Sequence, residues 1–414
     1  MAVLDQLTSQ QAMDLENKYG AHNYHPLPVV LSKGEGVYVW DVEGKQYYDF
    51  LSAYSAVNQG HCHPKIVDAM VSQAKTLTLT SRAFYNDMLG KYEKFATEMF
   101  GFDKLLPMNT GAEAVETALK LCRKWAYEVK GIDENEADII VCENNFHGRT
   151  TTIISFSNDP VAREHFGPYT KGFIKIAYDN LEALEAELKS NPNVAGFMAE
   201  PIQGEAGVYV PSEGYLAKAK ALCEKYNVLF IADEVQTGIA RTGKLLAVDH
   251  ENVKPDVLIL GKALSGGAYP VSAVLANDNV MNVIKPGNHG STFGGNPVAA
   301  AVAIAALEVV RDEQLAEKAE DLGNLFRSEL NKYIETSNTV NLVRGKGLLN
   351  AIVINDEEDS DTAWNICLAL RDNGLLAKPT HGNIIRFAPP LVMTKEQLLD
   401  CVSIITKTLK AFEK

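Results

Sequence analysis

The sequence lacks long hydrophobic runs and an excess of positive charge, and both absences exclude classes of partner. Its 414 residues carry 39 Lys and Arg against 53 Asp and Glu, which gives a formal net charge of −14. So acidic a chain is disfavoured as a partner of nucleic acid or of an anionic membrane surface. Lysines and other polar residues interrupt every apolar run before it reaches the length of a membrane span. We therefore expect no nucleic-acid partner and no membrane partner.

Cysteine is also scarce, with six residues and no C-x-x-C pair. This pattern is typical of core thiols in a reducing compartment. The triplet His61-Cys62-His63 has metal-binding residue types, but no second cluster lies at ligand spacing, so we expect no metal. The first residues show neither a secretory signal nor an Arg-rich transit peptide. We expect a cytoplasmic protein, or one of the mitochondrial matrix from which a transit peptide was removed.

What the sequence does contain is a regular alternation of strand and helix patterns between about residues 55 and 290. The strand candidates are short runs without polar alternation, at 139–142, 194–199, 228–232, 257–260 and 271–276. Runs of this kind are buried on both faces, as in a mostly parallel sheet covered by helices. The sequence therefore predicts an α/β fold.

Simpler signals flank this region. On the N-terminal side a helix is followed by a hairpin around the turn 41–44. On the C-terminal side Asn296 caps a long apolar helix whose first residue is Pro297. The last helix begins with a capping box of Thr394 and Gln397. Its apolar stripe comprises Leu398, Val402, Ile405, Leu409 and Phe412.

Two charged residues close strands of the predicted sheet. Asp233 follows five apolar residues, where a carboxylate is unfavourable unless it is paired. It is either a structural cap or ion pair, or the partner of a cationic ring nitrogen. Lys262 follows the run at 257–260, and small residues come after it. Most lysines are surface groups, but burial here would free the amine as a nucleophile toward an aldehyde.

A third signal is the segment 109–114, in which Thr110 and Glu113 form a capping box at the start of a helix. Taken alone it is an ordinary capped helix, but backbone N–H groups at such a start also bind phosphate. The glycine-rich segment around Ser291 and Thr292 is either a plain loop or a second phosphate contact. A near match to a nucleotide-binding loop at 238–245 is rejected, because Leu245 replaces the Ser or Thr that would bind magnesium.

Together these signals fit one cofactor, pyridoxal 5'-phosphate (PLP). They supply an amine for its aldehyde, an acid that keeps its pyridinium protonated, and a site for its phosphate. In open α/β sheets, ligands bind beyond the carboxyl ends of the strands, which is where these residues are predicted. Their joint occurrence carries the prediction.

The motifs VLFIADEVQTG, GKALSGGAYPVSAVL and HGSTFGGNP resemble those of the class III (ω-amino-acid) aminotransferases. The similarity extends over nearly the whole chain and is closest to the branch that acts on ornithine, as in FLSAYSAVNQGHCHP, NNFHGRT, EPIQGEAGV and IIRFAPPL. It implies the PLP-dependent transferase fold of type I, with a large domain over 55–295. A smaller α+β domain would combine 1–54 with the C-terminal part of 296–414, which begins with a long connecting helix. It also implies a homodimer with shared active sites.

The resemblance also implies roles for individual residues. Lys262 would hold PLP as a Schiff base and later move a proton, and Asp233 would bind the ring nitrogen. The other implied cofactor contacts are Phe146 and Val235 on the two ring faces, Gln236 near the phenolic oxygen, Gly111 and Ala112 at the phosphate, and Ser291 and Thr292 at the phosphate of the other subunit. His147, next to Phe146, is assigned no catalytic role.

The implied reaction moves the δ-amino group of L-ornithine to 2-oxoglutarate, a step between arginine catabolism and proline biosynthesis. Arg149 suits a bidentate contact with the ornithine carboxylate, and the resemblance places Tyr24 beside it and Tyr54 near the α-amine. The diacid needs a second carboxylate site near the cofactor, for which Arg386 is suited. In the family, the acid at Glu205 pairs with this arginine until the diacid binds. Without the resemblance, these residues have ordinary structural interpretations.

Two alternatives remain open. The first is another ω-aminotransferase, acting on acetylornithine or 4-aminobutyrate, and Tyr54 would discriminate because a free α-amine needs a polar partner. The second is a catalytically silent protein of the same fold. The presence of Lys262, Asp233, Arg149 and Arg386 together argues against it, because a binding module needs no nucleophilic lysine.

Overall fold

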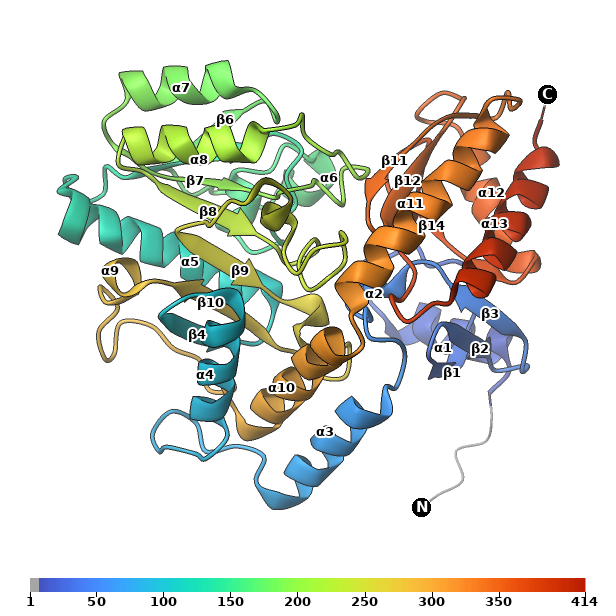
Figure 1. Ribbon diagram of the computed structural model, residues 1–414, viewed down its shortest axis with the longest axis horizontal. Coiled ribbons are helices and arrows are strands. Elements are labelled where there is room, and N and C mark those ends of the chain that lie inside the picture. Colours follow the sequence, from blue (N-terminus) through green and yellow to red (C-terminus); the bar gives the residue numbers. More distant parts are fainter. Residues whose placement is uncertain (1–6, 414) are drawn as a thin grey trace.

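The computed structural model describes residues 7–413, and a seven-stranded sheet forms the centre of its larger part (Figure 1). In sheet order the strands are β4 (Lys104–Met108), β10 (Ser272–Ala276), β9 (Val257–Leu260), β8 (Leu229–Asp233), β7 (Val194–Ala199), β5 (Asp138–Cys142) and β6 (Phe173–Ile176). The pairs from β9 to β6 are parallel, whereas β10 is antiparallel to both its neighbours. All five predicted strands are confirmed, as is the α/β class.

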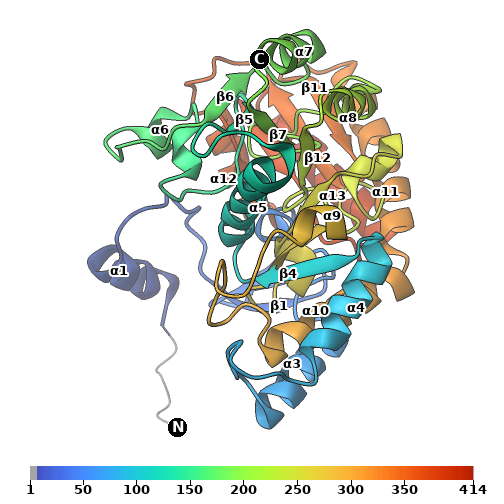
Figure 2. The ribbon, with the colours of Figure 1, turned by 90° about the vertical axis from the view of Figure 1, so that its left-hand side faces the viewer.

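Helices cover both faces of this sheet, so the strands carry apolar residues on both faces. One face packs against α5 (Gly111–Trp125) and α9 (Asp278–Met281). The other packs against α4 (Leu89–Phe100), α7 (Leu181–Ser190), α8 (Tyr215–Lys225) and α10 (Pro297–Asp312). Helix α3 (Pro64–Thr76) lies along α10 (Figures 1 and 2). Every residue of β7, β8 and β9 is buried, as the continuous apolar runs predict.

The smaller part of the molecule is built from the N-terminal and C-terminal segments of the chain (Figure 1). One sheet has the order β1 (Leu31–Glu35), β2 (Tyr38–Asp41), β3 (Gln46–Asp49) and β13 (Leu375–Leu376). The other has the order β11 (Val340–Lys346), β12 (Leu349–Ile354), β15 (Ile384–Phe387) and β14 (Lys378–Pro379). Its helices are α1 (Ser9–Tyr19), α11 (Leu315–Ile334), α12 (Thr362–Asp372) and α13 (Lys395–Lys410). The predicted hairpin is confirmed by the antiparallel pairing of β2 with β3.

The helix signals are confirmed in detail. Asn296 accepts from the Ala299 amide at 2.9 Å and begins α10. The capping boxes Thr110/Glu113 and Thr394/Gln397 are both formed. Helix α13 ends at Lys410, so Phe412 lies beyond it.

Short helical segments complete the fold: α2 (Ser52–Ser55), α6 (Pro160–Arg163), η1 (Ala126–Lys130), η2 (Ile153–Ser155), η3 (Ala247–Glu251) and η4 (Lys262–Ser265). No helix among residues 7–413 is both long and apolar enough to cross a membrane. The two histidines of the triplet at 61–63 bind different carboxylates, His61 to Asp49 and His63 to Glu313.

Candidate active site

The functional residues gather at one edge of the large sheet. Strands β5, β7, β8 and β9 run parallel, so their carboxyl ends meet at this edge. Asp233 ends β8 and Lys262 comes two residues after β9. Phe146 and Glu200 follow β5 and β7. The edge is the position expected for a ligand in an open α/β sheet.

Asp233 is buried and held by two donors. Its Oδ1 accepts from the Val235 amide at 3.0 Å, and its Oδ2 lies 2.6 Å from Nδ1 of His147. Burial lowers the pKa of His147, but the hydrogen bond and charge of Asp233, with the charge of Glu200, outweigh it and leave the pKa above its ordinary value. His147 has no partner for Nε2 among the described residues. This histidine therefore positions the carboxylate of Asp233.

Lys262 begins the short helix η4 with a φ of 45°, in the left-handed region that costs free energy for a residue other than glycine. Such strain concentrates at functional sites. Burial lowers the pKa of the Lys262 ammonium, and the charge of Arg386 lowers it further against the opposing charges of Asp233, Glu205 and Glu200. The amine is thus more readily available as a nucleophile and a base than a surface lysine.

One cavity of about 130 Å³ joins these groups. It is lined by Gly111, Ala112, Phe146, Asp233, Val235 and Lys262, with His147, Gly148, Glu200 and Gln236. The start of α5 borders it closely, since a Cβ on Gly111 would lie only 3.0 Å from Cγ1 of Val235. Two buried polar atoms near the cavity, His147 Nε2 and Glu200 Oε1, have no partner among the described residues.

These residues fit PLP on several counts. An acid at one point of the cavity wall and an amine at another match the ring nitrogen and the aldehyde. The free N–H groups at the start of α5 match the phosphate. Phe146 and Val235 supply apolar surface for a flat ring. Glu200 accepts from the Phe146 amide at 3.0 Å and so holds this residue in place.

The second predicted phosphate contact lies near the first. Ser291 Oγ accepts from Asn109 Nδ2 at 2.9 Å, next to Thr110, the cap of α5. Thr292 is exposed, and so is Phe293. The structure therefore brings Ser291 close to the start of α5 in its own chain and leaves Thr292 exposed.

Arg386 lies in β15, is fully buried at 0% exposure, and is held by neutral groups. Its Nη1 donates to Gln236 Oε1 at 2.7 Å and its Nη2 to Ser55 Oγ at 3.0 Å. Burial lowers the pKa of the guanidinium, and the charge of Glu205 opposes this shift. Glu205 acts on Arg386 through its charge alone, so the close pairing expected from the family is replaced by Gln236 and Ser55.

Arg149 is exposed and lies among aromatic rings. Its guanidinium carbon is 5.9 Å from the ring centre of Tyr24 and 5.7 Å from that of Phe146. Arg149, Glu205 and Phe146 line a larger cavity of about 630 Å³. The structure thus brings together Tyr24 and Arg149, as predicted from the resemblance.

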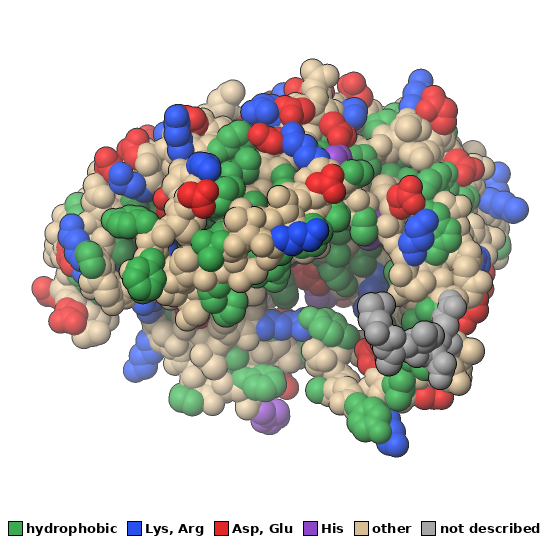
Figure 3. Space-filling view, turned by 90° about the horizontal axis from the view of Figure 1, so that it is seen from below, with side chains coloured by type: hydrophobic (Ala, Val, Ile, Leu, Met, Phe, Trp, Pro, Cys, Tyr) green, Lys and Arg blue, Asp and Glu red, His purple; other side chains and the backbone are tan. Residues whose placement is uncertain are grey.

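Tyr54 contacts Arg386 and lies within the influence of both arginine charges. Its ring centre is 5.7 Å from the guanidinium carbon of Arg386. Burial raises the pKa of its phenol, the charge of Glu205 raises it further, and Arg386 and Arg149 oppose the shift. The phenol therefore stays protonated and can donate or accept a hydrogen bond. Figure 3 shows a deep hollow near the centre of one face of the molecule, with charged side chains at its walls.

Comparison with known proteins finds similarity to aminotransferases. The family Aminotransferase class-III matches residues 19–409. The mitochondrial ornithine aminotransferase of Drosophila melanogaster is 66% identical over 394 residues, which are 95% of this chain and 90% of that protein. A crystal structure named acetylornithine aminotransferase from Elizabethkingia anophelis is 67% identical, with a TM-score of 0.91, over 98% of this chain and 100% of the other.

A third relative is the ornithine aminotransferase of Toxoplasma gondii. Its structure has a TM-score of 0.96 and 51% identity, over 99% of this chain and 95% of the other. It is described as having partial occupancy of PLP at its active site.

Proposed function

Because the chain belongs to the class III aminotransferase family, we propose that this PLP-dependent transaminase moves the δ-amino group of L-ornithine to 2-oxoglutarate. The products are glutamate-5-semialdehyde, which cyclises, and L-glutamate. The observation that carries the proposal is that Lys262, Asp233 and the start of α5 line one cavity. Arg149 lies against Tyr24 and Arg386 against Tyr54, at 5.9 and 5.7 Å from the ring centres.

PLP, when bound, supplies an aldehyde that receives the amino group and a cationic ring that withdraws electrons from the reacting carbon. Asp233, oriented by His147, would hold the ring nitrogen. Gly111 and Ala112 would hold the phosphate, and Phe146 and Val235 the ring faces. Lys262 would bind the aldehyde and then move the proton of the substrate carbon, for which its lowered pKa suits it.

The substrate side of the site separates two carboxylates. Arg149 and Tyr24 would bind the carboxylate of ornithine and Tyr54 would contact its α-amine, which leaves the δ-amine directed to the aldehyde that Lys262 would hold. Arg386 binds the α-carboxylate of 2-oxoglutarate deep in the site. The negative charge of Glu205 near Arg386 disfavours α-carboxylate binding there by ornithine. This arrangement gives each substrate one productive orientation.

A homodimer with shared sites forms part of the proposal. Phe84, Tyr85 and Phe293 are exposed by 74%, 104% and 52%, and exposed apolar groups of this size mark protein contacts. Phe293 adjoins Thr292, the residue expected at the phosphate of the partner subunit. Sedimentation equilibrium of wild type and Phe293→Asp measures the mass: we expect a dimer that the charge weakens.

The decisive assay compares amino donors. Purified enzyme with 2-oxoglutarate is offered ornithine, N-acetylornithine, lysine and 4-aminobutyrate, and glutamate formation is measured. We expect ornithine to give the highest kcat/KM. N-acetylornithine is the second candidate because the Elizabethkingia anophelis relative carries that name; a higher kcat/KM for it would overturn the proposed donor.

A spectroscopic test addresses the cofactor independently of the donor. The protein should be yellow, and borohydride should fix the cofactor on the peptide that contains Lys262. A colourless protein that added PLP cannot reconstitute would favour the silent alternative. Cell fractionation distinguishes the cytoplasm, which we propose, from the mitochondrion named for the fly relative.

A further inference from the structure

The short helix α2 is left-handed. Its four residues have positive φ angles: 50° at Ser52, 46° at Ala53, 58° at Tyr54 and 70° at Ser55. Residues other than glycine rarely enter this region, and then singly, because Cβ approaches the following carbonyl oxygen. Four in succession persist only where the surrounding structure holds them, and such strain is typical of functional sites.

The small domain holds the segment on both sides of this turn. The Ala388 amide donates to the Phe50 carbonyl at 2.7 Å, and the Leu391 amide donates to the Asn58 carbonyl at 2.8 Å. Both donors follow Arg386 closely in the chain. The position of the turn relative to β15 is therefore set by backbone hydrogen bonds before and after it.

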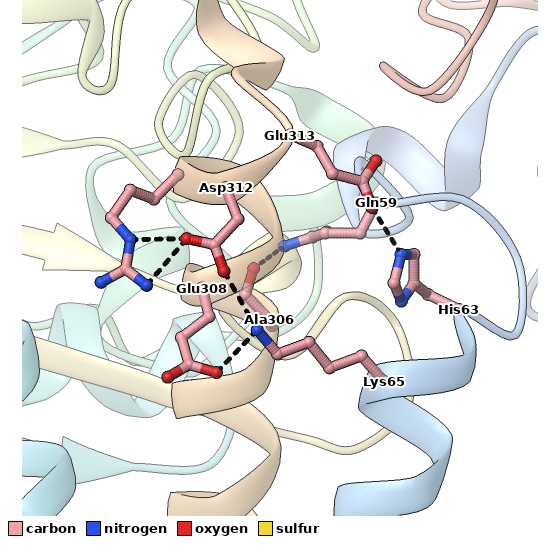
Figure 4. Close-up of polar contacts among 8 residues, drawn as sticks. Gln59, His63, Lys65, Ala306, Glu308, Asp312 and Glu313 are labelled. Carbon is pink, nitrogen blue, oxygen red and sulfur yellow. Dashed lines mark hydrogen bonds and ion pairs between the residues drawn. The ribbon is translucent and has the colours of Figure 1, made fainter.

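The large domain holds the same segment from the other side. Asn58 donates to the Ile239 carbonyl at 2.8 Å. The buried side-chain amide of Gln59 donates to the carbonyl of Ala263, the residue after Lys262, at 2.9 Å. It also donates to the carbonyl of Ala306 on α10 at 3.2 Å, a contact shown in Figure 4. The turn thus lies on a connection between the catalytic lysine and the strand that carries Arg386.

Ser55 faces this arginine directly. It is 1% exposed, and its Oγ accepts from Arg386 Nη2 at 3.0 Å. The other acceptor, Gln236, is also neutral, while Nε of Arg386 is buried with no partner among the described residues. Neutral acceptors orient a guanidinium without neutralising it. The positive charge therefore remains available for a substrate carboxylate.

We propose that Ser55 is a positioning residue for the 2-oxo acid, which it serves by orienting Arg386, and that the left-handed turn sets the distance from this guanidinium to Lys262. The inference rests on the proposed function. It predicts that the hydroxyl of Ser55 matters in the half-reaction that consumes 2-oxoglutarate much more than in the half-reaction that consumes ornithine.

The test uses a matched pair on the same turn. Ser52 is also fully buried, but its hydroxyl has no partner among the described residues. Ser55→Ala and Ser52→Ala remove the same atom from equally buried positions. Ser55→Gly removes the same hydroxyl, and glycine adopts the φ of 70° at this position freely. This variant therefore still tests the role of the hydroxyl if Ser55→Ala folds poorly. Absorbance of the bound cofactor follows each half-reaction separately.

We expect both Ser55 variants to lower kcat/KM for 2-oxoglutarate about tenfold or more, the usual effect of one hydrogen bond to a charged group. Their effect on the ornithine half-reaction should be at least about fivefold smaller, and Ser52→Ala should stay within about twofold of wild type. The inference is overturned if the Ser55 variants match Ser52→Ala or if both half-reactions fall equally. If ornithine did not change the absorbance of the cofactor bound to the wild-type protein, the proposed function itself would be refuted.

Discussion

The molecule has two arginines that we assign to substrate carboxylates, and their surroundings are opposite. Arg386 is fully buried on a strand, and its guanidinium is fixed by Gln236 and Ser55 at 2.7 and 3.0 Å. Arg149 is exposed on a loop, with the rings of Tyr24 and Phe146 5.9 and 5.7 Å from its guanidinium carbon. Arg386 is thus enclosed and fixed by hydrogen bonds, whereas Arg149 is open to solvent.

The difference follows from what each site has to bind. A 2-oxo acid reacts at the carbon next to its carboxylate, so its arginine must lie at a fixed, short distance from Lys262. The ornithine carboxylate lies at the far end of a flexible chain, so small shifts of Arg149 cost little. A buried cation without a carboxylate partner costs free energy in the empty protein, and binding of an anion recovers it. We therefore expect substitutions at Arg386 to have larger effects than those at Arg149.

The largest effect is expected for Arg386→Lys. A lysine keeps the charge but cannot make a bidentate contact, and it would lose the contact to either Gln236 or Ser55. We expect kcat/KM for the 2-oxoglutarate half-reaction to fall about 100-fold, equivalent to about 3 kcal/mol. The control is Arg311→Lys, an exposed arginine whose guanidinium carbon lies 5.6 Å from the ring centre of Phe95, away from the site. A loss confined to the ornithine half-reaction would reverse our assignment of the two arginines.

Arg149→Lys should have a smaller effect on the other half-reaction. The site is open to solvent, so the lost contact is worth less, and we expect kcat/KM for ornithine to fall about tenfold. Measurement of both half-reactions in the same preparation gives the ratio directly. If Arg149→Lys proved as damaging as Arg386→Lys, burial would not be what distinguishes the two sites.

Tyr54 lies against Arg386 and tests the selectivity of the site for the amino donor. Tyr54→Ile removes the polar partner of the α-amine, so kcat/KM for ornithine should fall about tenfold, with a smaller change for 4-aminobutyrate, which has no α-amine. Tyr54→Phe separates the loss of the hydroxyl from the loss of the ring. An unchanged preference between the two donors in Tyr54→Ile would remove this residue from the specificity argument.

The sequence predicted the residues at the strand ends of this site better than the contacts that join them to other parts of the chain. Asp233 and Lys262 were found because continuous apolar runs identify parallel strands, whose ends meet at one edge. His147 was given no catalytic role, and nothing in the sequence shows that it folds back onto Asp233, 86 residues later. Its position next to Phe146 was the only available signal. Strands β4 and β6 were also missed, since each is short and contains a lysine.

Ser55 was out of reach of sequence reasoning for a physical reason. Left-handed backbone is recognised from glycine or asparagine, and the turn at 52–55 contains neither. Local bonds from the amides of Leu51 and Ser52 to Asp49 begin the turn, and long-range bonds such as that from Ala388, more than 300 positions away, hold its position. The resemblance gave Arg386 an acidic partner, Glu205, whereas its hydrogen bonds in the structure go to Gln236 and Ser55.

The last prediction concerns stability rather than catalysis, at a buried acid whose charge acts on both Lys262 and Arg386. Burial raises the pKa of Glu200 to about 7, although the charge of His147 and the bond from the Phe146 amide oppose the shift. The folded protein thus holds a proton that the unfolded chain, with an ordinary pKa of 4.5, has released. The resulting loss of stability begins near the unfolded pKa and grows until the pH passes about 7.

Glu200→Gln removes this titration and keeps an acceptor for the Phe146 amide. In the cofactor-free protein, the free energy of unfolding of the variant relative to wild type should rise between pH 5 and pH 8 by about 3 kcal/mol at most. The midpoint of thermal unfolding, measured across this range, should therefore shift by several degrees in favour of the variant. Glu134→Gln, at an exposed carboxylate, serves as the control. Parallel pH profiles for wild type and Glu200→Gln would contradict this prediction. They would show that Glu200 stays ionised across the range because His147 balances its charge, so that pairing rather than burial determines the charge of Glu200.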